Sequence, residues 1–124
     1  MSVEVRGGDK IDRHLRQLAA REKRVRNKAL RAAAVAVADR LEKNTPEDKK
    51  SRGKHLKDDV KISGVKQDGS VVIGYGKDTY WRAHFVEMGT IKMNPQHFIL
   101  QTEREMSTQV IHIMETEIKR GLGL

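Results

Sequence analysis

The five histidines are the first residues to consider for chemistry, because an imidazole can bind a metal ion or exchange a proton near neutral pH. They stand at positions 14, 55, 84, 97 and 112. No two of them have the spacing of an HExxH motif, and no acidic cluster shares a helical face with them. We therefore predict no metal site and no cofactor, and we expect His84 to be a core or interface side chain.

Acidic side chains offer two further arrangements. Glu87 stands in an aromatic-rich segment that also holds an arginine, where a carboxylate beside a cation could act as a general acid or base. The same carboxylate could instead accept backbone N–H bonds in the turn that follows it, and we favour this structural role. Asp58 and Asp59 are adjacent in an expected strand, so they point to opposite faces and form no paired metal site. We predict no catalytic residue and no enzyme.

The most basic part of the chain runs from Lys10 to Arg31 and holds nine cations against two acids. Four of these cations could track a phosphate backbone: Arg13, Arg16, Arg24 and Arg31. No aromatic platform for base stacking lies between them, so the stretch could supply only sequence-independent contact with nucleic acid. An acidic protein partner or a solvated helix face would explain the same charges equally well.

Length and composition limit the class of protein. The 124 residues fit one domain, residues 1–124, whose core must be filled mainly by aliphatic side chains because only 4% of the residues are aromatic. Cysteine is absent, which excludes disulfides, thiolate metal sites and cysteine nucleophiles. The N-terminus lacks the apolar region of a signal peptide, and no apolar run is long enough for a membrane span. We expect a cytoplasmic origin, with stability supplied by packing or by association with other subunits.

The spacing of apolar residues predicts the first elements of the fold. Alternation over residues 3–6 predicts a short strand that ends at two glycines. Helical periodicity then extends over residues 10–43, with a break conceivable in the polar run at 21–28. Pro46 ends this helix, because the residue before a proline disfavours helical backbone.

The second half reads as a small sheet followed by a helix. Alternating segments at residues 56–65, 71–76 and 80–88 predict a three-stranded antiparallel meander, with an Asp68-Gly69 turn in its first hairpin. Asn94-Pro95 predicts the start of a last helix. The predicted fold is therefore α+β: a short N-terminal strand, a long helix, the meander, and a C-terminal helix packed on the sheet.

Two segments of this predicted fold have an unusual composition: one holds the aromatic residues and the other is a highly charged loop. All five aromatic residues lie between Tyr75 and Phe98, so we expect the core to be organised there. The loop at residues 47–54 carries no apolar anchor, and we expect it to be mobile in the free protein and to order on binding. Its candidate residues are Lys49, Lys50, Arg52, Gly53 and Lys54.

Two blocks of the sequence resemble a known family. Residues 45–60, TPEDKKSRGKHLKDDV, have a proline after a long helix, a polar loop with glycine, and a leucine that opens a strand. Residues 84–90, HFVEMGT, are similar to an aromatic-Val-Glu-aromatic-Gly-Thr core, although Met88 replaces the second aromatic residue. On these blocks the chain resembles the tail-completion and head–tail joining proteins of tailed bacteriophages.

The resemblance implies a structural virion protein at the tail terminus or neck, made in the host cytoplasm. It implies a homo-oligomeric ring, for which six subunits is one candidate size, between the head connector and the tail tube proteins. Basic residues would face the phage DNA, without a membrane contact. The loop and turn residues implied in docking and assembly are Glu87, Gly89, Thr90, Lys92, Pro95 and Phe98.

Two other classes of protein stay open at this stage. A small basic nucleic-acid-binding module would explain the charge asymmetry, since residues 1–66 hold 19 Lys and Arg against 10 Asp and Glu, but not the Gly-Thr segment. A nuclease or another enzyme would explain neither feature.

Overall fold

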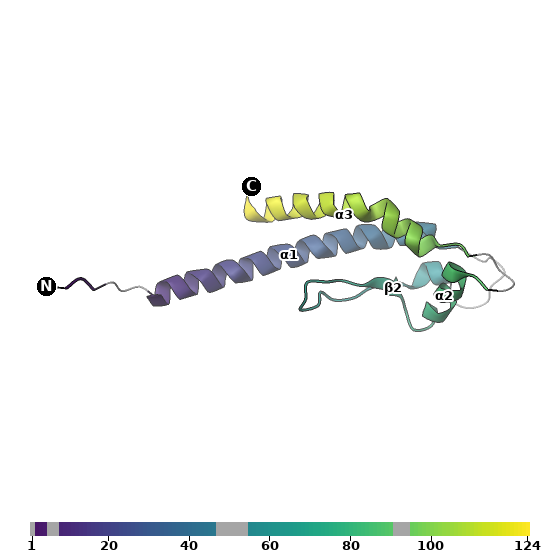
Figure 1. Cartoon of the computed structure of the whole chain (residues 1–124), viewed down its shortest axis with the longest axis horizontal. Helices are drawn as coiled ribbons and strands as arrows, with labels where there is room; N and C mark the ends of the chain where they lie inside the picture. Colours follow the sequence, from purple (N-terminus) through teal and green to yellow (C-terminus); the bar gives the residue numbers. More distant parts are fainter. Residues whose placement is uncertain (1, 5–7, 47–54, 91–94) are drawn as a thin grey trace.

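One helix, α1 (Gly8–Asn44), runs along most of the molecule (Figure 1). The computed structural model describes residues 2–4, 8–46, 55–90 and 95–124. The predicted long helix is confirmed, and it passes without a break through the polar run at 21–28. It ends beside Pro46 as the sequence predicts, and the Thr45 N–H donates to the carbonyl oxygen of Leu41 at 2.9 Å.

The N-terminal strand predicted over residues 3–6 is not formed by the described part of that segment. Residues 2–4 have no regular structure, and Val3 is 93% exposed. Alternation alone does not form a strand, because its backbone N–H and carbonyl groups need a neighbouring strand as partner. Residues 5 and 6 lie outside the described residues.

A two-stranded antiparallel hairpin follows α1. The strands β1 (Val60–Ile62) and β2 (Ile73–Tyr75) pair so that Val60 lies opposite Tyr75. The predicted turn is confirmed: Gly69 has a φ of 80°, and the carboxylate of Asp68 accepts the Ser70 N–H at 3.0 Å. The strand expected from Leu56 starts later, because a short 3-10 helix, η1 (Leu56–Asp59), precedes β1.

The largest correction concerns α2 (Tyr80–Met88), which is a helix where the sequence predicts a third strand. A turn after β2 starts this helix, since the N–H groups of Thr79 and Tyr80 both donate to the Gly76 carbonyl oxygen. The core-facing residues Ala83 and Val86 are three positions apart, which is a helical spacing. Aromatic residues favour strands when a half-buried sheet surface receives them, and here most of them face solvent.

The last helix, α3 (Phe98–Leu122), begins three residues after Pro95, the helix start predicted from the sequence. His97 is its N-cap and has a left-handed backbone with a φ of 47°. At the other end Gly123 is the C-cap with a φ of 73°, and its N–H donates to the Arg120 carbonyl oxygen at 3.3 Å. Gly121 is inside the helix, one residue before its end.

The helix α3 runs antiparallel to α1, on the side away from the hairpin (Figure 1). Buried Ala29 and Ala33 allow the two helices to approach closely. Near the C-terminal end of α3, a Cβ built on Gly121 would lie 2.8 Å from Val25. The prediction that the last helix packs on the sheet is therefore wrong over most of its length, because α1 lies between the two.

The core sits at the end of the molecule where α1, the hairpin, α2 and α3 meet. Its buried members are Leu41, Leu56, Ala83 and Phe98. The ring of Tyr75 meets that of Phe98 edge-on, with the ring centroids 6.1 Å apart. The core is thus close to the aromatic-rich segment, but it uses two of the five aromatic rings rather than all of them.

Candidate assembly site

Glu87 ties α2 to the start of α3. Its backbone carbonyl oxygen accepts the His97 N–H at 3.2 Å, and its carboxylate accepts the N–H groups of Ile99 at 2.7 Å and Leu100 at 3.1 Å. A carboxylate at this position satisfies free donors in the first turn of α3 and complements the helix dipole. The predicted structural role as an acceptor of backbone N–H bonds is confirmed, but the donors belong to α3 rather than to the Gly89-Thr90 turn.

The chain leaves α2 through a conformation that requires glycine. Gly89 has φ 80° and ψ 170°, a region that residues with a side chain rarely adopt. Its N–H donates to the Phe85 carbonyl oxygen at 2.8 Å, which closes the end of α2. After the loop, the N–H of Gln96 returns to the Val86 carbonyl oxygen at 3.1 Å. Both ends of the predicted docking loop are therefore fixed to α2.

A buried carboxylate supports the other end of α2. Asp59 is 1% exposed and accepts the Thr79 hydroxyl at 2.7 Å, just before the first residue of the helix. Its backbone carbonyl oxygen accepts the Gly76 N–H at 3.0 Å, and Lys61 Nζ lies 3.9 Å from its carboxylate. Asp58 is exposed, so the two aspartates do point apart, although they stand in η1 and not in a strand. Sequence reasoning missed the role of Asp59, which the Gly-x-x-Thr turn before α2 could have signalled.

The solvent side of α2 is apolar, and sequence reasoning missed this surface because it treated the segment as a strand. On a helix, positions 80, 81, 84, 85 and 88 share one face. Four large apolar side chains on it are 49–62% exposed: Tyr80, Trp81, Phe85 and Met88. His84 is also exposed and meets the Phe85 ring edge-on at 5.9 Å, so it is not a core histidine. We call these five residues the aromatic face of α2.

Several predicted docking residues can be placed beside this face. Glu87 and Gly89 fix the loop ends as described above, Pro95 and Thr90 are exposed, and Phe98 is buried in the core at 2% exposure. Phe98 therefore supports α2 and the start of α3 from within the core, and it is not itself available to a partner. Lys92 lies outside the described residues, as does the whole predicted loop from Lys49 to Lys54.

A polar clamp fixes α3 to the C-terminal end of α1. Asn44 donates to the Thr102 hydroxyl at 2.9 Å and to the Glu105 carboxylate at 3.1 Å, and Arg40 donates to the same carboxylate. Hydrogen bonds from Arg40, Gln101 and Asn44 lower the pKa of Glu105 to about 2. The clamp aligns α3 along α1 next to the core.

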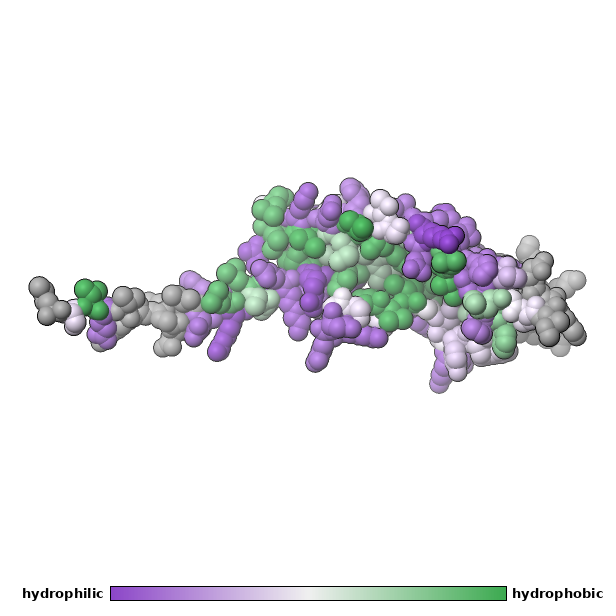
Figure 2. Space-filling view, in the orientation of Figure 1, coloured by the Kyte–Doolittle hydropathy of each residue, from purple (hydrophilic) through white to green (hydrophobic). Residues whose placement is uncertain are grey.

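The other end of α1 has no such cover. Its residues 12–18, which we call the projecting segment, extend beyond the C-terminal end of α3 (Figure 1). Leu15 and Leu18 are 58% and 53% exposed there. Figure 2 shows hydrophobic side chains gathered along the line where α1 and α3 meet and continuing onto this segment. The apolar face of α1 therefore extends beyond the end of α3, the helix that covers the rest of it.

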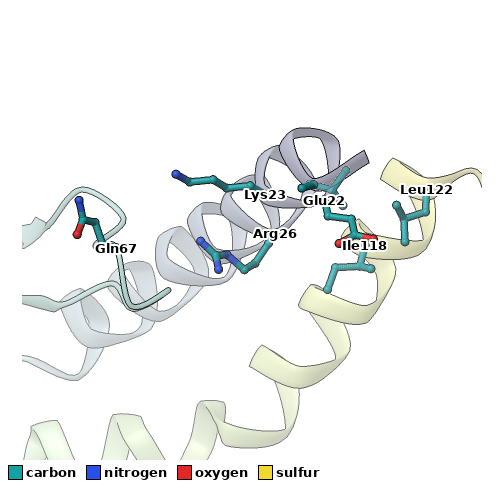
Figure 3. Close-up of a pocket in the computed structure, with 8 residues that line it drawn as sticks. Glu22, Lys23, Arg26, Gln67, Ile118 and Leu122 are labelled. Atoms are coloured by element: carbon teal, nitrogen blue, oxygen red, sulfur yellow. The ribbon is translucent and has the colours of Figure 1, made fainter. Parts of the chain in front are cut away.

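A cleft of about 560 Å³ opens where α3 ends, between α1 and the hairpin turn. In Figure 3, Glu22 lies near Ile118, whereas Arg26 points toward the hairpin side, where Gln67 lies. Arg26 donates to the Asn27 side-chain oxygen at 3.3 Å. The cleft has mixed polar and apolar walls, and it carries no group of acids or histidines.

Metal and membrane roles find no support in the described residues. No three histidine or acidic side chains among them are grouped closely enough to hold a metal ion. None of the described helices is both long enough and apolar enough to span a bilayer. The four predicted basic residues, Arg13, Arg16, Arg24 and Arg31, are all exposed on α1.

Comparison with known protein families gives a match over most of the chain. Residues 9–89, more than half of the chain, match the HK97-gp10-like family, described as "Bacteriophage HK97-gp10, putative tail-component". The match covers α1, the hairpin and α2 and stops at Gly89, before α3 begins. No curated protein and no solved structure gave a significant match. This chain belongs to the HK97-gp10-like family of bacteriophage tail components.

Proposed function

We propose that the protein completes the tail of a phage or prophage particle and joins the tail to the head connector, as a ring of identical subunits. It acts as a structural protein, and its partners are neighbouring copies of itself, the head connector and the tail tube. Membership of a family of tail components supports a place in the virion. The position at the tail end and the assembly into a ring go beyond family membership, and we argue them from two exposed apolar surfaces.

The observation that carries the proposal is the aromatic face of α2. A nine-residue helix presents Tyr80, Trp81, Phe85 and Met88 to solvent in a chain that has only five aromatic residues. Exposed apolar patches of this kind mark interaction surfaces, and aromatic residues dominate the energetics of interfaces. The rigid attachment of α2 through Asp59 and Glu87 preorganises the face for docking, which lowers the entropy cost of binding.

A second exposed apolar surface supports assembly into a ring. The projecting segment with Leu15 and Leu18 lies near the opposite end of the molecule from α2 (Figure 1). A ring requires that one surface of each subunit docks on a different surface of the next. Two unlike apolar surfaces far apart on one chain satisfy this requirement.

Deletion of the gene from the phage or prophage tests the role. Electron microscopy of the lysate should show separate DNA-filled heads and tails, because the joint between them is missing. Tails of abnormal length would move the role to tail termination. Intact infectious particles would contradict both roles.

The turn at Gly89 gives a test at the level of one residue. Gly89→Val should reduce the yield of joined particles at least tenfold, because a β-branched residue is strained at a φ of 80° and the loop to α3 would be displaced. Gly64→Val is the matched control, since Gly64 has no heavy atom within 4 Å of an added Cβ. Equal particle yields from the two variants would show that the turn conformation does not matter for assembly.

A further inference from the structure

The exposed side of α1 carries a line of cations. Positions 13, 17, 21, 24, 28 and 31 follow each other at steps of three and four, so they lie on one helical face. Five of the six are basic, and we call them the cationic stripe: Arg13, Arg21, Arg24, Lys28 and Arg31. All five are exposed. From the first to the last the stripe is about 27 Å long, at a rise of 1.5 Å per residue.

The described part of the chain offers the stripe almost no partner. Arg21 makes one long hydrogen bond, 3.4 Å, to the carbonyl oxygen of Gly121 at the end of α3. The other four cations form no hydrogen bond or ion pair with any side chain that the structure describes. Their charges are therefore available to a ligand, and no acid whose side chain the structure describes forms an ion pair with them.

The remaining charges of this part of α1 lie off the stripe. Glu22, the only acid between Arg13 and Ala38, is about half a turn away from Arg24 and lines the cleft near α3. Lys23 and Arg26 also line that cleft, and Arg26 is half-buried (Figure 3). The stripe therefore contains no acidic residue. It includes three of the four arginines predicted from the sequence, Arg13, Arg24 and Arg31, and the fourth, Arg16, lies at its border.

The chemistry of the stripe favours a nucleic acid over a protein partner. Cores of protein interfaces are depleted in charged residues and are anchored by apolar or aromatic side chains. The stripe has no large apolar member, although small Ala20 lies on the same face. Leu18 lies at its edge beside Arg21, and the first large apolar residue on the face itself is Val35, beyond its end. Along 27 Å, duplex DNA carries about 16 phosphate charges. The last four cations stand about 4.5–6 Å apart along the axis and Arg13 lies about 12 Å from Arg21, so each cation can find a phosphate.

We propose that the cationic stripe of α1 binds the phosphate backbone of duplex DNA without regard to base sequence. This inference goes beyond the proposed docking role and does not depend on it, since none of the five cations lies on α2 and four of them lie outside the projecting segment. In an assembled particle, the stripe would line the path of the DNA.

Fluorescence anisotropy tests the proposal. The purified full chain is titrated into a labelled random-sequence duplex of about 30 base pairs, which is longer than the stripe. Affinity is measured between low and moderately high potassium chloride. The wild-type log affinity should fall with log salt with a slope of about −4, as expected for four or five phosphate contacts. The triple variant R24Q/K28Q/R31Q should bind at least tenfold more weakly at low salt, with a slope less steep by about 3.

A matched variant separates the stripe from the net charge. K66Q/K77Q/R104Q removes the same number of charges from exposed positions on the hairpin, on the turn before α2 and on α3. It should keep the wild-type affinity within threefold. Glutamine favours helix nearly as well as lysine and arginine, and circular dichroism checks that α1 is intact.

Three results would overturn the inference. The first is no DNA binding at low salt. The second is an equal loss of affinity in both triple variants, which would indicate an effect of net charge alone. The third is equally tight, stripe-dependent binding of poly-glutamate, which would assign the stripe to an acidic protein surface. None of these results would affect the head–tail joining test, because that test measures particle assembly.

Discussion

The two ends of this molecule differ in how completely their side chains are satisfied. At the end where α2, the hairpin and the start of α3 meet, Phe98 and Leu56 are buried and the polar Asp59, Thr79 and Thr45 have hydrogen-bond partners. At the projecting segment, Leu15 and Leu18 face solvent. The first end supplies the stability of the fold. The second end exposes apolar side chains that other molecules can contact. The aromatic face of α2 does the same on the solvent side of the first end.

The largest difference between the two ends should appear on truncation of one apolar side chain. Phe98→Ala should lower the free energy of unfolding by about 3–5 kcal/mol, because it leaves a cavity in the core. Leu15→Ala should change it by less than about 0.5 kcal/mol in the isolated protein, because Leu15 is exposed. Urea denaturation of both variants measures the two values. Similar losses would show that the projecting segment is packed in solution.

A smaller effect is expected from two glycines of the same hairpin region. A Cβ on Gly76 would lie 2.6 Å from both carboxylate oxygens of Asp59, whereas one on Gly64 meets nothing within 4 Å. Gly76→Ala should therefore displace the Asp59 side chain, weaken its bond to Thr79, and cost about 1–3 kcal/mol of stability. Gly64→Ala should be close to neutral. Thermal unfolding of the pair checks this, and equal melting temperatures would remove Asp59 as a support of α2.

The cap of α3 should contribute about as much as other helix caps. Glu87→Ala removes the acceptor of two N–H groups and should cost about 0.5–2 kcal/mol. Glu87→Gln keeps one neutral acceptor oxygen and should cost less. Hydrogen exchange at Ile99 and Leu100 locates the effect, since loss of the cap should raise exchange there and leave the β1–β2 amides unchanged. Uniformly faster exchange would mean that Glu87 acts on the whole fold.

The smallest expected effect is a pH dependence at the clamp between α1 and α3. The pKa of Glu105 is lowered to about 2 by hydrogen bonds from Arg40, Gln101 and Asn44, so its folded value lies below the usual value of about 4.3. Stability from this group is complete above pH 4.3 and is lost as the pH falls toward 2. Because Glu105 is at the surface, solvent screens the gain. Urea midpoints between pH 5 and 2 should fall more steeply for the wild type than for Glu105→Gln.

Prediction from the sequence succeeded where local pattern decides the structure. The helix α1 has an apolar periodicity that extends from Ile11 to Leu41 and a proline just after its end, and the hairpin turn has Asp68-Gly69 with the required positive φ. Each of these signals acts over neighbouring residues. The HFVEMGT block also identified the family that the comparison confirmed.

Prediction failed where distant residues decide the structure. The segment at 80–88 has aromatic residues that favour a strand, but a buried Asp59 twenty residues earlier holds the turn that starts a helix. Its aromatic side chains then have no sheet to cover and form an exposed face. The acceptor role of Glu87 could be predicted, but its donors could not, because they belong to a helix beyond the loop.

The proposed docking surface of the assembling particle is the aromatic face of α2. The most direct test is electron microscopy and titre of particles from a deletion phage complemented with Trp81→Ser/Phe85→Ser. The control is Val72→Ser/Ile111→Ser, which removes two other apolar side chains that are 51% and 60% exposed. If the face docks, the first variant should be folded and yield at least tenfold fewer joined particles, while the control keeps the wild-type yield. Wild-type yield from the Trp81→Ser/Phe85→Ser variant would show that the particle does not dock through this face.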